Sequence, residues 1–198
     1  KVELSMMLRW GDEKTLQGKT ITVADVGVGA YTNARGSSLT GSAGRIVRLD
    51  DGATDQQELV GGISSPTAVT VGADGVVYYV ERHTRVMKLP NGGKPEAVPF
   101  EVGKDDDVTG VAVDKDGAVY TLVGDLSQEL QVLRPGAAAP EKLPLKADEP
   151  HTIVVDDTGA VYVLDTGFDE VVWKLERGAA EAKKSPVSGL TRPDGLAV

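Results

Sequence analysis

The sequence lacks cysteine altogether, has only 2 histidines, and draws only 5% of its 198 residues from the aromatic types. Without cysteine the chain cannot form disulfides, a cysteine-ligated zinc or iron–sulfur centre, or a thiol nucleophile. It has no apolar run long enough to cross a bilayer, so no membrane span is predicted. Its formal net charge is −9, which argues against a nucleic-acid partner, because such a partner requires a basic face.

Glycine, by contrast, is abundant. The chain has 24 glycines, about 12% of its residues, whereas an average protein has about 7%, and this excess predicts many tight turns. The sequence begins at Lys1 without a basic-then-apolar segment of the signal-peptide type. We therefore expect a mature product or an excised piece of a longer protein.

The glycines follow an internal repeat with a period of 42 residues. The segments 75–78, 117–120 and 159–162 have the sequences Gly-Val-Val-Tyr, Gly-Ala-Val-Tyr and Gly-Ala-Val-Tyr. The preceding segments keep the same spacing and begin at Pro66, Val108 and Pro150. A regular period of this length is typical of repeat architectures such as solenoids and propellers.

Within each unit the hydrophobic period is two, which predicts β-strands rather than helices. Alternating apolar residues predict a first strand, an Asp-Gly or Thr-Gly turn follows, and a segment rich in valine and tyrosine predicts a second strand. A third strand and a weaker fourth strand complete the unit. Four short antiparallel strands about every 42 residues are typical of a propeller blade. We therefore predict an all-β fold, a β-propeller of four-stranded antiparallel blades.

The whole chain, residues 1–198, is predicted to form one propeller domain with about 4.7 units. The predicted blades are residues 1–60, 61–102, 103–146 and 147–189, with a partial unit at 190–198. In the first blade, alternating apolar residues at 2–8 predict the inner strand, and a polar Gly/Ser-rich loop is inserted at 27–44. Loops of this length are usually functional or disordered. The candidate binding residues of the insertion are Tyr31, Asn33 and Arg35.

The units resemble NHL repeats, on the residues 109–120, 161–175 and 193–198. They are most similar to the extracytoplasmic sensor propellers of actinobacterial receptor Ser/Thr kinases and to related secreted proteins. The resemblance covers residues 61–198 well and the preceding part loosely. It implies an extracytoplasmic or secreted protein and a ring that usually closes with six blades. It is specific for the fold and not for the activity, because propellers host many functions.

Six blades of this size would need about 250 residues, so two ways of completing the ring are open. In one, the chain is part of a six-bladed propeller whose other blades lie elsewhere. In the other, residues 190–198 supply the inner strand of the first blade and close a four-bladed ring. We favour the first, because six-bladed geometry is what the resemblance implies.

Propellers bind ligands on the face formed by the loops that lead into the inner strands and the loops that follow the second strands. In this chain these loops carry carboxylates and one imidazole, which we expect around the mouth of the central channel. The candidate residues on this face are Thr67, Glu81, Thr109, Asp125, His151, Asp165, Phe168 and Asp194. In the first blade, Asp25 is at the end of the predicted second strand.

The acidic residues of this face have two interpretations. In one, they form a Ca²⁺ site of hard oxygen ligands, as in the propeller lactonases and esterases. In the other, they recur only because the motif recurs. Asp25 then pairs with Arg45, and Glu81 with Arg85, as contacts at the blade edge. We favour the second interpretation, because a catalytic site should break the symmetry of the repeat.

We therefore predict a non-catalytic binding propeller, an extracytoplasmic sensor or scaffold that binds a protein partner or a small ligand on this face without a cofactor. The alternative is a propeller hydrolase, lactonase or lyase that depends on calcium or another metal, with His151 or a carboxylate as the base. A zinc site built from both histidines is not expected, because His83 and His151 have different registers. A structural subunit of a larger complex is the third possibility.

Overall fold

The structure, a computed structural model, describes residues 21–25, 31–32, 38–39, 44–50, 52–125 and 128–198. All regular secondary structure in these ranges is β-strand. The described residues accordingly include no apolar helix of the length that would cross a bilayer. The all-β prediction is confirmed, whereas the inner strand predicted at 2–8 lies outside the described residues.

The strands form four antiparallel sheets and one small hairpin. The first sheet contains, in spatial order, β1 (Ile21–Asp25), β4 (Gly44–Leu49) and β5 (Gln57–Ile63). The second contains β6 (Pro66–Val71), β7 (Val77–Glu81), β8 (Arg85–Leu89) and β9 (Glu96–Ala97). The third contains β10 (Asp107–Val113), β11 (Val119–Gly124), β12 (Glu129–Leu133) and β13 (Glu141–Leu143). The fourth contains β14 (Pro150–Val155), β15 (Val161–Asp165), β16 (Val171–Leu175) and β17 (Lys183–Lys184). The hairpin pairs β2 (Tyr31–Thr32) with β3 (Ser38–Leu39).

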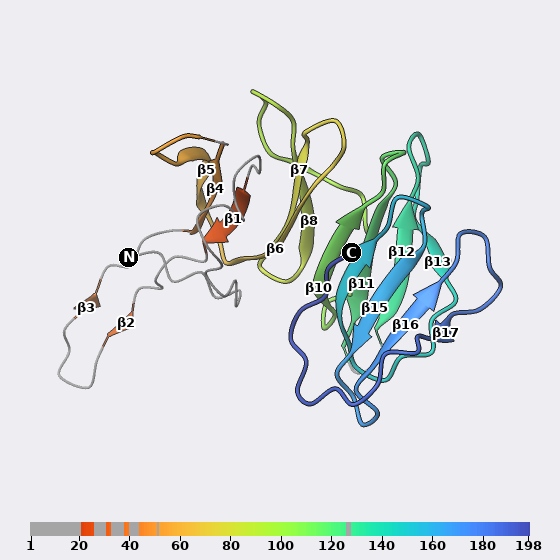
Figure 1. The fold of residues 1–198 in the computed structure, drawn as a ribbon. Helices are drawn as coiled ribbons and strands as arrows, with labels where there is room; N and C mark the ends of the chain where they lie inside the picture. Colours follow the sequence, from red (N-terminus) through yellow and green to blue (C-terminus); the bar gives the residue numbers. More distant parts are fainter. Residues whose placement is uncertain (1–20, 26–30, 33–37, 40–43, 51, 126–127) are drawn as a thin grey trace.

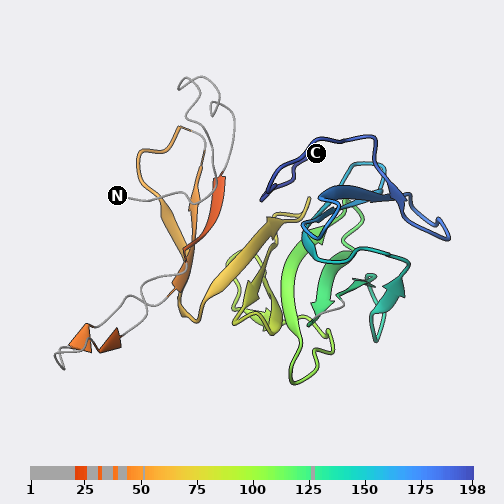
Figure 2. The same cartoon turned by 90° about the horizontal axis from the view of Figure 1, so that it is seen from below.

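The innermost described strands of successive sheets lie next to one another. β1 contacts β6, β6 contacts β10, and β10 contacts β14. Figure 2 shows the four sheets following one another around an arc, and the same order runs from left to right in Figure 1. This radial arrangement of antiparallel sheets is a β-propeller, and we name the sheets blades 1 to 4 in chain order.

The second strands of blades 2 and 3 lie in the middle of their sheets and between two neighbouring blades. All 5 residues of β7 and all 6 residues of β11 are therefore buried. Because side chains alternate along a strand, Val77 and Tyr79 face blade 1, while Tyr78 and Val80 face blade 3. A strand that is buried on both faces requires such a continuous apolar run.

The hydrophobic core is divided into three layers, one between each pair of neighbouring blades. Between blades 2 and 3, the linker that follows β9 adds Val98 to the buried residues, and Phe100 packs against them. Between blades 3 and 4, Leu122 and Leu130 pack against Val163. Full burial of one such side chain contributes about 1.5–3 kcal/mol, so each blade is stabilised mainly by its neighbours.

A repeated carboxylate closes the turn between the first and second strands of blades 3 and 4, which we name the hairpin end. Asp114 Oδ1 accepts hydrogen bonds from the backbone N–H groups of Asp116 (3.0 Å) and Ala118 (2.8 Å). Its Oδ2 accepts one from the Tyr120 hydroxyl (3.1 Å). Asp156 forms the equivalent bonds 42 residues later. The glycine of each turn has φ between +80° and +83°, a conformation that glycine adopts without strain.

A register shift recurs near the start of each inner strand. It lies between Pro66 and Val69 in β6, Val108 and Gly110 in β10, and Pro150 and Thr152 in β14. A β-bulge of this kind redirects a side chain. Three of the predicted candidates lie within these shifts, namely Thr67, Thr109 and His151.

The carboxylates at the ends of the second strands follow the predicted series in blades 2 and 4 but not in blade 3. Glu81 and Asp165 each pair with the proline that begins the neighbouring inner strand. In blade 3 the equivalent residue is Val123, which is buried, because β11 continues to Gly124. Asp125, which the sequence comparison aligned with this series, lies beyond the strand and is exposed.

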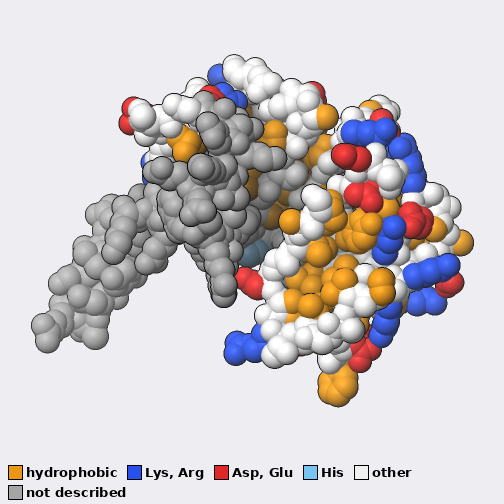
Figure 3. All heavy atoms as spheres, viewed as in Figure 1, with side chains coloured by type: hydrophobic (Ala, Val, Ile, Leu, Met, Phe, Trp, Pro, Cys, Tyr) orange, Lys and Arg blue, Asp and Glu red, His pale blue; other side chains and the backbone are white. Residues whose placement is uncertain are grey.

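Blade 4 has one face turned away from blade 3. On this face, Tyr162 and Leu164 are the repeat equivalents of Tyr120 and Leu122, which are buried between blades 3 and 4. The Nζ atom of Lys174 lies 5.3 Å from the centre of the Tyr162 ring, within the range of a cation–π contact. Figure 3 shows hydrophobic side chains gathered over the part of the molecule formed by β14 to β16.

Residues 190–198 return to the inner side of blade 4 after β17. The Thr152 hydroxyl donates a hydrogen bond to the carbonyl oxygen of Asp194 (3.4 Å), so this segment lies beside β14. Among the described residues it forms no strand and pairs with no strand of blade 1. The described residues therefore show no closure of a four-bladed ring.

Candidate functional site

The predicted candidates of blades 2 to 4 lie on one face of the propeller. We define this channel face as the first residues of β6, β10 and β14 with the segments that precede them, together with the last residues of β7, β11 and β15 with the loops that follow them. The antiparallel registers bring the two sets of loops together, since the start of each inner strand pairs with the end of its second strand. The contacts of each candidate side chain show whether it is already hydrogen-bonded within the protein or is accessible to a ligand.

Asp165 is fully occupied by hydrogen-bond donors and is 4% exposed. Its Oδ1 accepts from the backbone N–H groups of Glu149 (2.9 Å) and Gly167 (3.1 Å). Its Oδ2 accepts from the backbone N–H of Asp148 (3.0 Å) and the indole of Trp173 (3.0 Å). Burial raises the pKa of Asp165, but these hydrogen bonds outweigh burial and hold the pKa below its usual value. Asp165 therefore connects two loops and has no lone pair left for a ligand.

Glu81 has the same position in blade 2 and a similar role. Its Oε1 accepts a hydrogen bond from the backbone N–H of Ser64 (3.1 Å), and its Oε2 pairs with Arg85 at 2.6 Å. The predicted edge contact between Glu81 and Arg85 is thus confirmed. In blade 1, Asp25 is the backbone partner of Arg45 in the register of β1 and β4.

These carboxylates do not form the calcium site that was one of the two interpretations of the sequence. Ca²⁺ requires six to eight oxygen ligands, but the oxygens of Glu81 and Asp165 already accept N–H groups. Within the described part of the chain, no three His, Asp or Glu side chains cluster closely enough to hold a metal ion. We therefore assign no metal ion to Glu81 or Asp165.

The channel face of blades 2 and 3 has hydroxyl and amide groups beside its charged side chains. The Thr109 hydroxyl donates a hydrogen bond to Oε1 of Gln128 in the β11–β12 loop (2.7 Å). Thr67 and Asp125 are exposed. His83 is exposed too, and it lies in the β7–β8 loop, apart from the histidine of blade 4. Sequence reasoning missed Gln128, because only the folded register brings it to Thr109.

His151 takes the place in blade 4 that threonine has in blades 2 and 3. Its side chain is 50% exposed, and its Nε2 lies 3.7 Å from Oδ1 of Asp194. Asp194 belongs to the following repeat unit, so the packing of this unit beside β14 forms the pair. An accessible imidazole of this kind is a side chain that can act as a general base towards a bound substrate.

An open hollow of about 560 Å³ is lined by Asp194 of this pair. Small-molecule sites commonly have volumes of about 300–1,000 Å³, so the hollow is large enough for a small ligand. It joins the β15–β16 loop to the segment after β17. The residues that line it are Thr166, Glu170, Arg192, Pro193 and Asp194.

Glu170 and Arg192 are two lining residues that the sequence did not single out. Glu170 Oε2 accepts a hydrogen bond from the backbone N–H of Arg192 (3.1 Å). Both residues have positive φ, +44° and +50°, a conformation that costs a non-glycine residue about 1–2 kcal/mol. The Arg192 guanidinium forms no ion pair with the described residues. Arg192 directly precedes Pro193, where the next repeat unit begins, and this position is the sequence signal for it, although no sequence pattern reveals the strained backbone.

Phe168 lies in the β15–β16 loop, between two residues that line the hollow. Its side chain is 98% exposed. Among the described residues, the other large hydrophobic side chains that are exposed are aliphatic. An aromatic side chain presented to solvent beside a hollow is a candidate ligand contact.

The candidates in the insertion are separate from this site. Asn33 and Arg35 lie outside the described residues. Tyr31 lies in β2, opposite Leu39 of β3. Figures 1 and 2 both show the β2–β3 hairpin well away from blade 4.

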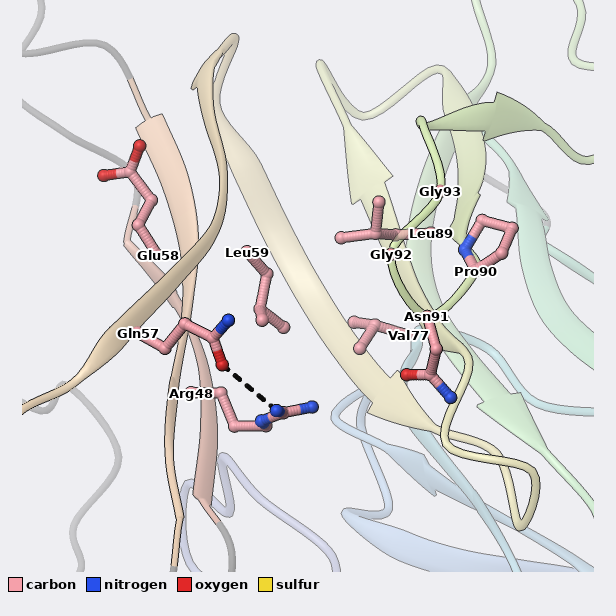
Figure 4. A pocket seen from close by; sticks show the side chains of 10 residues that line it. All are labelled: Arg48, Gln57, Glu58, Leu59, Val77, Leu89, Pro90, Asn91, Gly92 and Gly93. Carbon is pink, nitrogen blue, oxygen red and sulfur yellow. Dashed lines mark hydrogen bonds between the residues drawn. The ribbon is translucent and has the colours of Figure 1, made fainter. Parts of the chain in front are cut away.

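A second hollow, of about 460 Å³, lies between blades 1 and 2. Figure 4 shows Arg48 and Gln57, joined by a hydrogen bond of 3.1 Å, on one side of it. Leu89 and the turn at 90–93 form the other side. Neither hollow has a histidine in its lining, but Asp194, which lines the hollow of blade 4, lies 3.7 Å from Nε2 of His151. The hollow of blade 4 is therefore the better candidate for catalysis.

Comparison with known proteins supports the fold. The chain matches no protein-family model and no curated protein. It is similar to the structure of a streptogramin B lyase, with a TM-score of 0.62 at 13% identity over 89% of this chain and 62% of the lyase. It is also similar to a gluconolactonase from Xanthomonas campestris, with a TM-score of 0.57 at 16% identity over 82% of this chain and 62% of that one. A third structure is a catalytically inactive histidine-to-alanine variant of virginiamycin B lyase from Staphylococcus aureus with quinupristin. Its TM-score is 0.55 at 12% identity, over 86% of this chain and 61% of the lyase.

These similarities correct the function predicted from the sequence. The three structures named above are two lyases and a gluconolactonase, which contradicts a non-catalytic sensor and favours the alternative of a hydrolase, lactonase or lyase. At such identities they show the fold of this chain, and the chain spans about three fifths of their length. Support for an activity must therefore come from this chain's own residues.

Proposed function

We propose that the protein is a β-propeller enzyme that opens an ester or lactone bond at the channel face of blade 4, by hydrolysis or by elimination. One observation carries the proposal. His151 replaces a repeated threonine, lies within a register shift of β14, and has its Nε2 3.7 Å from Oδ1 of Asp194, a residue that lines the hollow. This pair breaks the symmetry of the repeat, as a catalytic site should.

His151 acts as the general base. In hydrolysis, its Nε2 removes a proton from water while the water oxygen attacks the carbonyl carbon. The acyl C–O bond then breaks, and the leaving alkoxide takes the proton back. In elimination, Nε2 removes a proton from a carbon next to the one that bears the ester oxygen. A C=C bond forms as the C–O bond breaks, and the substrate's carboxylate leaves. In both, Asp194 is the charged neighbour of the His151 ring, 3.7 Å from its Nε2.

Arg192 is the group that can stabilise negative charge on the substrate. Its guanidinium lines the hollow and has no ion pair among the described residues. The hydrogen bond from its backbone N–H to Glu170 holds the main chain in place. A single donor aimed at a developing oxyanion contributes about 10²–10³-fold to a rate. Arg192 therefore supplies the electrostatic part of the proposed mechanism.

The similar structures support this assignment in two respects. Their printed names include lyases and a gluconolactonase, and in one lyase a histidine-to-alanine change gives a catalytically inactive protein. The repeat residues further support blades of the NHL type and an enzyme that acts outside the cytoplasm. Fractionation of the producing cells tests the location, since recovery in the cytoplasmic fraction would contradict it.

The experiment that tests the function measures turnover of a panel of lactones, aryl and alkyl esters and cyclic depsipeptides by mass spectrometry. The three proteins compared are the wild type, His151→Ala and His83→Ala. We expect His151→Ala to lower kcat/KM by about 10²–10⁴-fold, because it removes the general base. His83→Ala is the matched control, since it removes the other exposed histidine of the channel face, and we expect activity within about 2-fold of the wild type.

Mass spectrometry also distinguishes the two reactions, because hydrolysis adds one water to a lactone and elimination leaves its mass unchanged. Equal activity of His151→Ala and the wild type would reject the assigned base. Absence of turnover across the whole panel would reject the function.

A further inference from the structure

The β15–β16 loop holds the most exposed large hydrophobic side chain of the described residues. Phe168 is 98% exposed, whereas Val71 and Val187 are each 46% exposed and lie elsewhere. Burying a phenylalanine side chain is favourable by about 1.5–3 kcal/mol. An exposed aromatic side chain beside a hollow is therefore able to bind an apolar ligand group.

Hydrogen bonds and close packing fix the backbone of the loop that presents Phe168. The backbone N–H of Thr166 donates to the Glu149 carbonyl oxygen (2.9 Å), and that of Gly167 donates to Asp165 (3.1 Å). A Cβ atom at Gly167 would lie 2.9 Å from Cβ of Asp148, so the loop packs too closely there for a larger residue. A loop fixed in this way loses little conformational entropy when it binds a ligand.

The same loop forms one wall of the hollow. Thr166 and Glu170, two residues before and two residues after Phe168, both line it, together with Arg192 and Asp194. A further backbone hydrogen bond, from Glu170 to Gly167 (3.2 Å), closes the turn that carries Phe168. A substrate whose carbonyl lies near Arg192 can therefore reach Phe168 with a substituent.

The charge of the hollow restricts the substrate further. Its lining has two carboxylates, Glu170 and Asp194, and one guanidinium, Arg192, and the chain as a whole has a net charge of −9. An additional negative charge on the substrate is therefore repelled. A neutral ring-bearing compound suits the hollow better than an acid.

We propose that Phe168 is a specificity-determining residue that stacks on an aromatic or similarly flat apolar ring of a neutral ester or lactone. This proposal rests on the function proposed above. Offset or edge-to-face stacking contributes about 0.5–1.5 kcal/mol beyond the area buried. The ring binds Phe168 in the ground state and in the transition state alike, so the effect falls on KM rather than on kcat.

The test compares phenyl-substituted γ-butyrolactone with the unsubstituted lactone in the wild type, Phe168→Ala and Phe168→Tyr. We expect Phe168→Ala to reduce the preference for the phenyl compound by about 10-fold, through KM, and Phe168→Tyr to restore it. Val187→Ala, which truncates an exposed side chain outside the hollow, should keep the wild-type preference. An unchanged preference in Phe168→Ala would overturn the proposal.

A binding measurement separates this proposal from the function. A phenyl-substituted lactam resists ring opening, and calorimetry gives its Kd without any turnover. If no lactone reacts but the lactam binds about 10-fold more weakly to Phe168→Ala, the aromatic contact is supported and the proposed activity is rejected. If lactones react and Phe168→Ala binds the lactam as tightly as the wild type does, the aromatic contact is rejected. A carboxylate added to the phenyl ring should weaken binding, and tighter binding would reject the charge argument.

Discussion

The two ends of the blades use repeated carboxylates for different contacts. At the hairpin end, Asp114 and Asp156 accept hydrogen bonds from within their own turns, and Gly72 takes their place in blade 2. At the channel face, Glu81 and Asp165 accept backbone N–H groups of the segment before the inner strand, and Val123 takes their place in blade 3. At each end the carboxylate recurs in two of the three four-stranded blades, and where it is present it fixes a loop of its own blade.

The comparison also separates structure from chemistry within the channel face. Asp165 recurs with the motif, and all its acceptor positions are filled by the protein. His151 and Phe168 depart from the motif and remain accessible. Polar residues that follow the repeat stabilise the blade, and residues that break it are the candidates for binding and catalysis.

The largest effect on stability is expected at Asp165. Replacing it with alanine leaves three backbone N–H groups and the Trp173 indole without an acceptor. We expect Asp165→Ala to lower the free energy of unfolding by about 3–5 kcal/mol, measured by urea denaturation. Asp125→Ala, a control on the same face with an exposed side chain, should change it by less than about 0.5 kcal/mol. A loss below about 1 kcal/mol at Asp165 would contradict its structural role.

Low pH should remove stabilising interactions at both ends of blade 4. The Thr158 hydroxyl is the main group that holds the pKa of Asp156 below its usual value, and the pKa of Asp165 is lowered as well. Because each folded-state pKa lies below the unfolded value, the stabilisation is present above about pH 4 and is lost as the pH falls through the folded-state pKa. We therefore expect the free energy of unfolding to decrease below about pH 4, and less steeply in Asp165→Asn, which cannot titrate there. Equal slopes in the two proteins would contradict this.

The smallest expected effect on stability compares a tyrosine hydroxyl that forms a hydrogen bond with one that forms none among the described residues. The Tyr162 hydroxyl donates to Asp156 (3.1 Å), whereas the Tyr79 hydroxyl is buried without a partner among the described residues. Tyr162→Phe should lower the free energy of unfolding by about 1 kcal/mol. Tyr79→Phe, the matched control, should leave it unchanged or slightly higher, since it removes an unsatisfied polar group. Thermal unfolding of both variants checks this, and an equal loss in the two would show that the bond to Asp156 contributes nothing.

Most of the architecture was accessible from the order of residues alone. The 42-residue period and the twofold alternation of apolar residues predict antiparallel blades, because strand pairing and side-chain alternation are local consequences of spacing. The same reasoning predicted the pair Glu81–Arg85, which lies across one hairpin. Asp125 lies in the loop directly after β11, and the 42-residue period itself places Val123, rather than Asp125, in series with Glu81 and Asp165.

The candidate site depended on contacts between distant segments. The carboxylate of Asp165 accepts hydrogen bonds from backbone N–H groups 16 and 17 residues away. The sequence does not show these contacts, and by itself it leaves this carboxylate as a candidate metal ligand. The pair of His151 and Asp194 forms only where one repeat unit packs beside the next. Sequence periodicity determines which residues are equivalent in the blades. Packing between the blades decides which of them already have a partner, and therefore which remain free to react.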